Sequence, residues 1–237
     1  MRVLSLLLVP LLAACAGTPS RQPDPVDPWE GYNRAMYGVN RTLDKAVLRP
    51  VARGYDFVTP DPVQRGVGNF FTNLHAPVVV LNLALQGRPG DSLAAVGRFV
   101  VNSTAGIAGV FDVATEIGVP QFNEDFGQTL AVWGWSESRY LVLPLLGPST
   151  LRDGPARGVD WMADVAAAWV RDEAGYGPMV VEVVDGRAGL LERETDLEEA
   201  YDEYLFVRDA WLQHRQFLIR EGEGDLPDYD SFFEDDE

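Results

Sequence analysis

GVGNFFTNLHAPVVVLNLALQGRPGDSLAAVGRFVVNSTAGIAGVFDVAT, residues 66–115, is the stretch that decides the fold of this chain. Its only charged side chains are Arg88, Asp91, Arg98 and Asp112. By contrast, 23% of the whole chain is charged. Pro77 and the segment 87–90 interrupt the stretch before any apolar run reaches the roughly 18 residues that a spanning helix needs. Short apolar helices that carry asparagines indicate contact with lipid and with one another, and the alternative from composition alone is a tightly packed soluble helical hairpin.

The composition of the whole chain suits a single domain with a modest core. It has 237 residues, of which 46% are hydrophobic, as is normal for a globular protein. The net charge is −17, and most of it lies from Glu182 onward, while the earlier sequence is nearly neutral. No basic patch is present that could neutralise phosphates, which argues against a nucleic-acid partner.

The N-terminus has the pattern of an export signal. Residues 1–14 begin with Arg2 and continue as an apolar run that is too short to span a bilayer. They end in Leu-Ala-Ala before Cys15, which resembles the bacterial lipobox, and Cys15 is the only cysteine. We therefore expect acyl chains on Cys15, and Ala16 after it indicates the outer membrane. The alternative is an ordinary signal peptide with a chance cysteine. Residues 15–28 are rich in proline and predict a lipidated, flexible tether.

Hydrophobic periodicity predicts an all-α body of roughly seven short amphipathic helices over residues 29–222. The first is expected from Trp29 to Val47, stopped or restarted at Pro50. A second begins near Asp61, and the residues after Pro77 form a separate short helix. No strand pair is expected. Residues 78–81, which read Val-Val-Val-Leu, are where a strand would most readily form. The acidic residues 223–237 predict a disordered tail.

The chemistry of an enzyme is not visible in the sequence. His75 and His214 are the only histidines, and no ligand spacing for a metal is present. The segment 134–138, with Ser136 and Ser138, only half resembles a nucleophile elbow, and no strand-turn-helix context surrounds it. We expect no catalytic residue, no metal and no cofactor apart from the acyl chains on Cys15.

Several separated motifs nevertheless resemble one family. They are the opening run from Asp27, the Asn-Phe-Phe-Thr-Asn-Leu of residues 69–74, the Asp-Phe-Gly-Gln-Thr-Leu of residues 125–130, the stretch 140–153 and the stretch 204–219. Together they resemble the MlaA (VacJ) family. The resemblance implies a ring-like, membrane-embedded helical body with an amphipathic channel, anchored at the periplasmic face of the outer membrane. Members remove phospholipids mislocalised in the outer leaflet and pass them to a periplasmic lipid-binding shuttle, with trimeric porins as membrane partners.

The apolar helices with amides at their edges could offer a lipid both an apolar and a polar path. The residues that we expect to line or gate the channel are Asn69, Phe70, Phe71, Asn73 and Leu74, with Asn82 and Asn102 as further candidates. The alternative is that these amides cap helix ends and satisfy buried backbone groups. A second class of function is a structural envelope lipoprotein that scaffolds a porin complex, and a third, weaker one is a membrane esterase.

Overall fold

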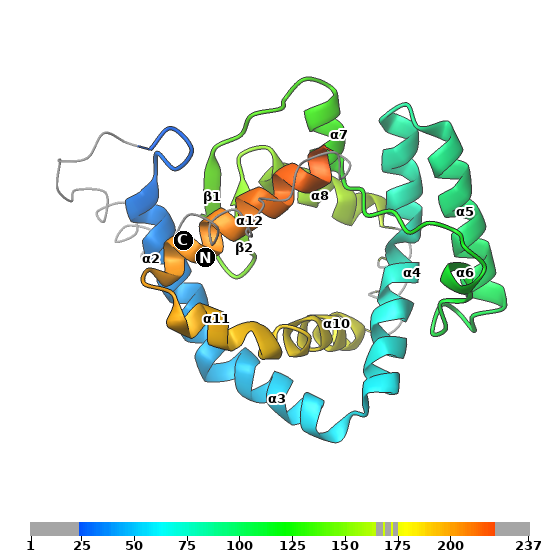
Figure 1. Ribbon diagram of the computed structural model, residues 1–237, viewed down its shortest axis with the longest axis horizontal. Coiled ribbons are helices and arrows are strands. Elements are labelled where there is room, and N and C mark those ends of the chain that lie inside the picture. The colour runs from blue at the N-terminus through cyan, green and yellow to red at the C-terminus, as the bar shows by residue number, and fades with distance from the viewer. Residues whose placement is uncertain (1–23, 165–167, 169–171, 173–174, 221–237) are drawn as a thin grey trace, which may run out of the picture.

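The computed structural model describes residues 24–164, 168, 172 and 175–220. The helices follow one another around a ring (Figure 1). The signal peptide, Cys15, most of the tether and the acidic tail lie outside the described residues, so those expectations remain predictions. Within the part of the chain that the structure describes, no helix combines the length and apolar character needed to cross a membrane.

The first side of the ring is one continuous helical run. α2 (Glu30–Leu43) passes into a π-helical turn (Asp44–Leu48) and then α3 (Arg49–Val58). Of the two outcomes expected at Pro50, the stop is wrong, whereas a new α-helix does start there. The π-helical turn shifts the hydrogen-bond ladder, because the backbone N–H of Arg49 donates to the carbonyl of Asp44, five residues back. Pro50 then falls in the first turn of α3, where its missing N–H costs little.

The second side is formed by two antiparallel helices. α4 (Asp61–Leu85) is 25 residues long and continues through Pro77. The predicted break there is wrong, and residues 78–81 are helical. A proline inside a helix costs about 3 kcal/mol, and here α4 offsets that cost by packing along α5 (Pro89–Thr104), as Figure 1 shows. The short helix α6 (Val113–Glu116) follows the loop at residues 105–112.

The remaining elements close the ring. In order they are α7 (Phe126–Val132), strands β1 (Tyr140–Leu143) and β2 (Gly147–Thr150), α8 (Asp153–Ala163), α10 (Gly177–Ala188), a 3₁₀ turn (Leu191–Arg193), α11 (Glu194–Glu199) and α12 (Glu203–Ile219). The strands form an antiparallel hairpin in which Tyr140 faces Thr150. This hairpin is the exception to the all-α expectation. It is covered by α2, whose Asn33 accepts a hydrogen bond from the Val142 N–H at 2.8 Å.

The interior of this fold is more polar than apolar. The main apolar cluster is small and consists of Met36, Tyr140, Val142 and Tyr204. Among the described residues, the buried polar and charged side chains slightly outnumber the buried apolar ones. Many large apolar side chains are exposed instead, including Phe57 at 90%. A water-soluble protein rarely exposes so much apolar surface, so this distribution marks an interaction surface.

Candidate functional site

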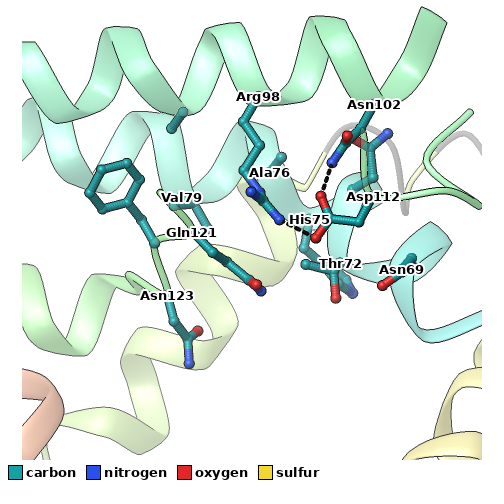
Figure 2. Close-up of a pocket in the computed structure, with 13 residues that line it drawn as sticks. Asn69, Thr72, His75, Ala76, Val79, Arg98, Asn102, Asp112, Gln121 and Asn123 are labelled. Carbon is teal, nitrogen blue, oxygen red and sulfur yellow. Dashed lines mark hydrogen bonds and ion pairs between the residues drawn. The ribbon is translucent and has the colours of Figure 1, made fainter. Parts of the chain in front are cut away.

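A cavity of about 300 Å³ lies between α4, α5 and residues 121–123 (Figure 2). Asn69, Asn73 and Asn102, three of the residues predicted from the sequence, help to line it. Phe70, Phe71, Leu74 and Asn82 are not among its lining residues. The structure therefore brings together three of the seven candidates, all of them asparagines.

The three asparagines bond to the loop at residues 105–112 and to the adjoining ends of α5 and α6. The Asn69 side-chain amide donates to the carbonyl of Val110 at 3.3 Å, and that of Asn73 donates to Ser103 Oγ at 2.9 Å. Asn102 accepts from the backbone N–H of Ala114 at 2.9 Å. The alternative interpretation, in which these amides satisfy other groups of the chain, thus describes the contacts that the structure shows. It leaves the proposed contact with lipid as a prediction.

The loop that they hold is closely packed and strained. Gly109 has φ +91°, and a Cβ there would lie 2.4 Å from Asn73 Cβ. Ile107 and Ala108 also adopt positive φ, of 52° and 57°, which is rare for a β-branched residue such as isoleucine. Strain of this kind persists only where surrounding contacts fix the backbone, and it is concentrated at functional sites.

An ion pair forms one wall of the cavity. Arg98 Nη2 lies 2.6 Å from Asp112 Oδ2, and Asn102 donates to the same carboxylate (Figure 2). Burial alone would raise the pKa of Asp112, but hydrogen bonds from Thr115 and Asn102 and the charge of Arg98 lower it below its usual value. The carboxylate therefore stays ionised and the arginine stays engaged with it.

His75 joins two other helices at the edge of the same cavity. Its Nδ1 lies 2.5 Å from Asp164, which follows α8, and its Nε2 lies 2.7 Å from Glu182 of α10. These hydrogen bonds, first that with Asp164, raise the pKa of His75 to about 10. At neutral pH the imidazole is therefore charged, and it links α4 to the end of α8 and to α10.

The other predicted residues pack elsewhere. Phe70 and Phe71 meet edge to face, with ring centroids 5.3 Å apart, and Phe71 is buried, while Leu74 is half-buried. Asn82 is buried and donates to Asp160 Oδ1 at 3.0 Å. It also accepts from Thr129 Oγ1 at 2.8 Å, so it ties α4 to α7 and α8.

A second buried polar cluster was not predicted from the sequence. Arg215 of α12 binds Asp125 through two hydrogen bonds of 2.5 and 2.7 Å, and binds Asp153 at 2.9 Å. Arg152 Nε also donates to Asp153 at 2.9 Å. Gly127 lies against this cluster, and a Cβ there would be 2.3 Å from Asp153 Oδ1. The signal that could have found the cluster is that these residues belong to the family-like stretches.

A larger, mainly apolar cavity was also missed. It has a volume of about 760 Å³ and lies between the hairpin turn, the α2–α3 run and the segment from α10 to α12. We call it the apolar groove, and its apolar walls include Leu43, Val47, Leu145, Leu146, Leu190 and Phe206. Its elements are distant in sequence, so no local pattern marks it. Its size falls within the range of small-molecule sites.

The outer face of α5 is the clearest exposed apolar surface. Leu93 is 71% exposed and Val100 51%, and the surface continues onto the loop through Ile107 and Phe111. No charged side chain is exposed between Leu93 and Phe111, because Arg98 is buried. α5 lies on the outside of α4 in the ring (Figure 1). This face is suited to hydrocarbon.

No catalytic or metal-binding arrangement is visible in the described residues. Ser136 and Ser138 lie in the loop after α7 and line a cavity whose described lining includes no histidine. Ser138 Oγ accepts a hydrogen bond from the Arg152 backbone N–H at 2.9 Å. Among the same residues, no group of three or more His, Cys, Asp or Glu could hold a metal ion.

The geometry thus defines a class: a helical, ring-shaped protein with exposed apolar surfaces, a charge-paired interior and two cavities that differ in polarity. The chain belongs to the MlaA lipoprotein family, whose model matches residues 25–218.

Similar proteins agree with this assignment. The intermembrane phospholipid transport system lipoprotein MlaA of Escherichia coli K12 is 34% identical over 218 residues, covering 90% of this chain and 86% of the relative. The protein of that name from Haemophilus influenzae is 30% identical, with 83% and 80% coverage. A solved structure described as the structural basis for maintenance of bacterial outer membrane lipid asymmetry has a TM-score of 0.71 and 33% identity, covering 81% of this chain and 98% of that one.

Proposed function

We propose that this chain is the outer-membrane lipoprotein of an intermembrane phospholipid transport system and that it maintains outer-membrane lipid asymmetry. It removes phospholipids mislocalised in the outer leaflet and passes them to a periplasmic lipid-binding shuttle. The observation that carries the proposal is the family match over residues 25–218. The buried polar side chains and the exposed apolar ones among the described residues support it, because this distribution suits a protein in contact with lipid.

The protein lies at the periplasmic face of the outer membrane, anchored by acyl chains on Cys15 and partly embedded. The charge-free face of α5 and the exposed Ile107 and Phe111 contact acyl chains there. A trimeric porin is the membrane partner. Amphipathic elements without a spanning helix bind in the plane of the interface, and several acyl chains make such binding stable.

Lipid passes through the ring without covalent change, so the protein is a transporter component and not an enzyme. A phospholipid needs an apolar surface for its chains and polar groups for its head. The walls of the apolar groove offer the first, and the charged and amide side chains that line both cavities offer the second. Movement down a gradient or through partner proteins requires no nucleotide site.

A deletion strain tests the proposal. Outer-leaflet phosphatidylethanolamine is labelled on intact cells with an amine-reactive reagent that cannot cross the membrane. Deletion should raise the labelled fraction, and the wild-type gene should restore it, whereas Cys15→Ala should not. Mass spectrometry of the purified protein should find an acylated Cys15 and bound phospholipid.

Substitution of Asn69 and Phe70 tests their part in the channel, and unchanged asymmetry in those variants would count against it. A structural lipoprotein that only scaffolds a porin complex would co-purify with porin, yet its deletion would leave labelling unchanged. That result would refute the transport function.

A further inference from the structure

We propose that the apolar groove is a binding site for a single phospholipid, with an acyl chain along its walls and the phosphate held by Arg193 at its rim. This inference rests on the proposed function and goes beyond it by assigning a ligand position and a headgroup-binding residue. It is carried by three observations: the walls, the charges and the fixed turn of the hairpin.

The walls of the groove expose apolar side chains. Leu145 and Leu146 at the hairpin turn are 77% and 64% exposed. On the other elements, Leu190 is 53% and Phe206 46% exposed, and both line the same groove. Exposed apolar surface lining a cavity is stabilised by an apolar ligand, because burial removes that surface from water.

The charges around the groove are paired, apart from that of Arg193. Arg187 binds Asp44 at 2.7 Å and also pairs with Glu194. Arg41 pairs with Glu203 of α12. Arg193 also lines the groove and is exposed, and its side chain forms no ion pair with any of the described residues.

The groove thus presents one uncompensated positive charge beside its apolar walls. The planar guanidinium group of arginine is well matched to phosphate oxygens and binds them through charge-assisted hydrogen bonds. An apolar chain with a phosphate at one end, as in a phospholipid, complements both features of the groove.

The hairpin wall is fixed before any ligand arrives. Leu145 has φ +64°, a strained value for leucine. Asn40 holds it there, because its Oδ1 accepts from the Leu145 N–H at 2.8 Å and its Nδ2 donates to the Leu143 carbonyl at 2.9 Å. A preformed wall avoids part of the entropic cost of ordering a loop on binding.

Native mass spectrometry of the full-length protein in detergent tests the assignment through ligand affinity. The ligands are phosphatidylglycerol, diacylglycerol with the same chains, and inorganic phosphate. The variants are Arg193→Gln, the wall variant Leu146→Asn, and Arg65→Gln as a matched control. Arg65 is an exposed arginine of α4 that likewise forms no ion pair with the described residues.

Arg193→Gln should weaken phosphatidylglycerol binding about tenfold, the effect of losing a charge-assisted hydrogen bond. It should leave diacylglycerol binding unchanged, while Leu146→Asn should weaken both lipids and Arg65→Gln neither. Equal loss in the two arginine variants, or no loss in either, would overturn the role of Arg193. Inorganic phosphate that binds as tightly as phosphatidylglycerol would overturn the acyl-chain site. Absence of any phospholipid binding by the wild-type protein would instead refute the proposed function itself.

Discussion

Replacing Arg215 by methionine should destabilise the closed ring more than replacing any exposed arginine. Arg215 donates to Asp125 and to Asp153, and it thereby joins α12 to the start of α7 and the start of α8. Methionine keeps much of the side-chain volume and removes the charge. The variant therefore leaves Asp153, which is 3% exposed, with Arg152 as its remaining cationic partner.

The magnitude follows from the burial of the two carboxylates. Removing one partner of a buried ion pair costs about 3–5 kcal/mol, whereas an exposed pair contributes up to about 1 kcal/mol. The Asp125 side chain is 41% exposed and can be solvated, and Asp153 keeps Arg152. We therefore expect a loss near the lower limit, about 3 kcal/mol. For a domain of this size that corresponds to a fall in Tm of about 6–12 °C.

The pH dependence of the stability difference between wild type and Arg215→Met is a second measurement, and the direction of its change can be predicted. Burial alone would raise the pKa of Asp153, but hydrogen bonds from Arg215 and Arg152 lower it below its usual value. A lowered pKa contributes stability above the unfolded-state value, about 4, and that stability is lost as the pH falls through the folded-state value. Because the variant lacks much of this contribution, the stability difference from wild type should narrow below about pH 4.

Thermal unfolding followed by circular dichroism in mild detergent measures both effects. Arg65→Met is the control, because Arg65 is exposed and forms no ion pair with the described residues. Its Tm should stay within about 2 °C of wild type, as is usual for surface substitutions. An Arg215→Met variant as stable as this control, or a difference that is constant from pH 7 to pH 3, would refute the reasoning.

Three further outcomes are expected. Gly127→Ala should lower stability by about 1–3 kcal/mol in the same unfolding experiment, because the added Cβ would lie 2.3 Å from Asp153 Oδ1; unchanged stability would contradict that contact. The pKa of His75 is raised to about 10, so the stability it contributes should be complete below about pH 6.5 and lost as the pH rises through 10; wild type and His75→Gln should therefore converge in alkaline unfolding curves. Ser136→Ala and Ser138→Ala should each leave outer-leaflet labelling at the wild-type level, and a rise would revive the esterase interpretation.

The parts of the fold that could be predicted are those governed by local periodicity. The apolar residues from Trp29 onward predict a helix, and α2 is one. The predicted break at Pro77 was wrong because the penalty of a single proline is smaller than the packing energy gained by keeping the helix intact, and Pro50 marks the start of α3 without ending the helical run. Pro77 lies in a helix that packs against α5, and Pro50 follows a π-helical turn. A short stretch of sequence around each proline reveals neither the packing of α4 against α5 nor the π-helical turn.

The sequence predicted some of the residues of the candidate site, but it predicted less well which groups they bond to. Three of the predicted asparagines do line one cavity, because their spacing places Asn69 and Asn73 on one edge of α4. The bonds of Arg215 to Asp153 and Asp125 join residues 62 and 90 positions apart. Only tertiary structure creates such pairs, so no spacing rule could have proposed them.

The polar interior has a physical reason in the proposed setting. A protein in water gains stability when apolar side chains leave water for its core, but a helix surrounded by acyl chains gains little from the same exchange. A ring at the membrane therefore needs hydrogen bonds and ion pairs to hold its elements in register. Asp125, Asp153 and Arg215 come from three different family-like stretches and meet at one point. These stretches of the family thus supply the ion pairs that join α12 to the starts of α7 and α8.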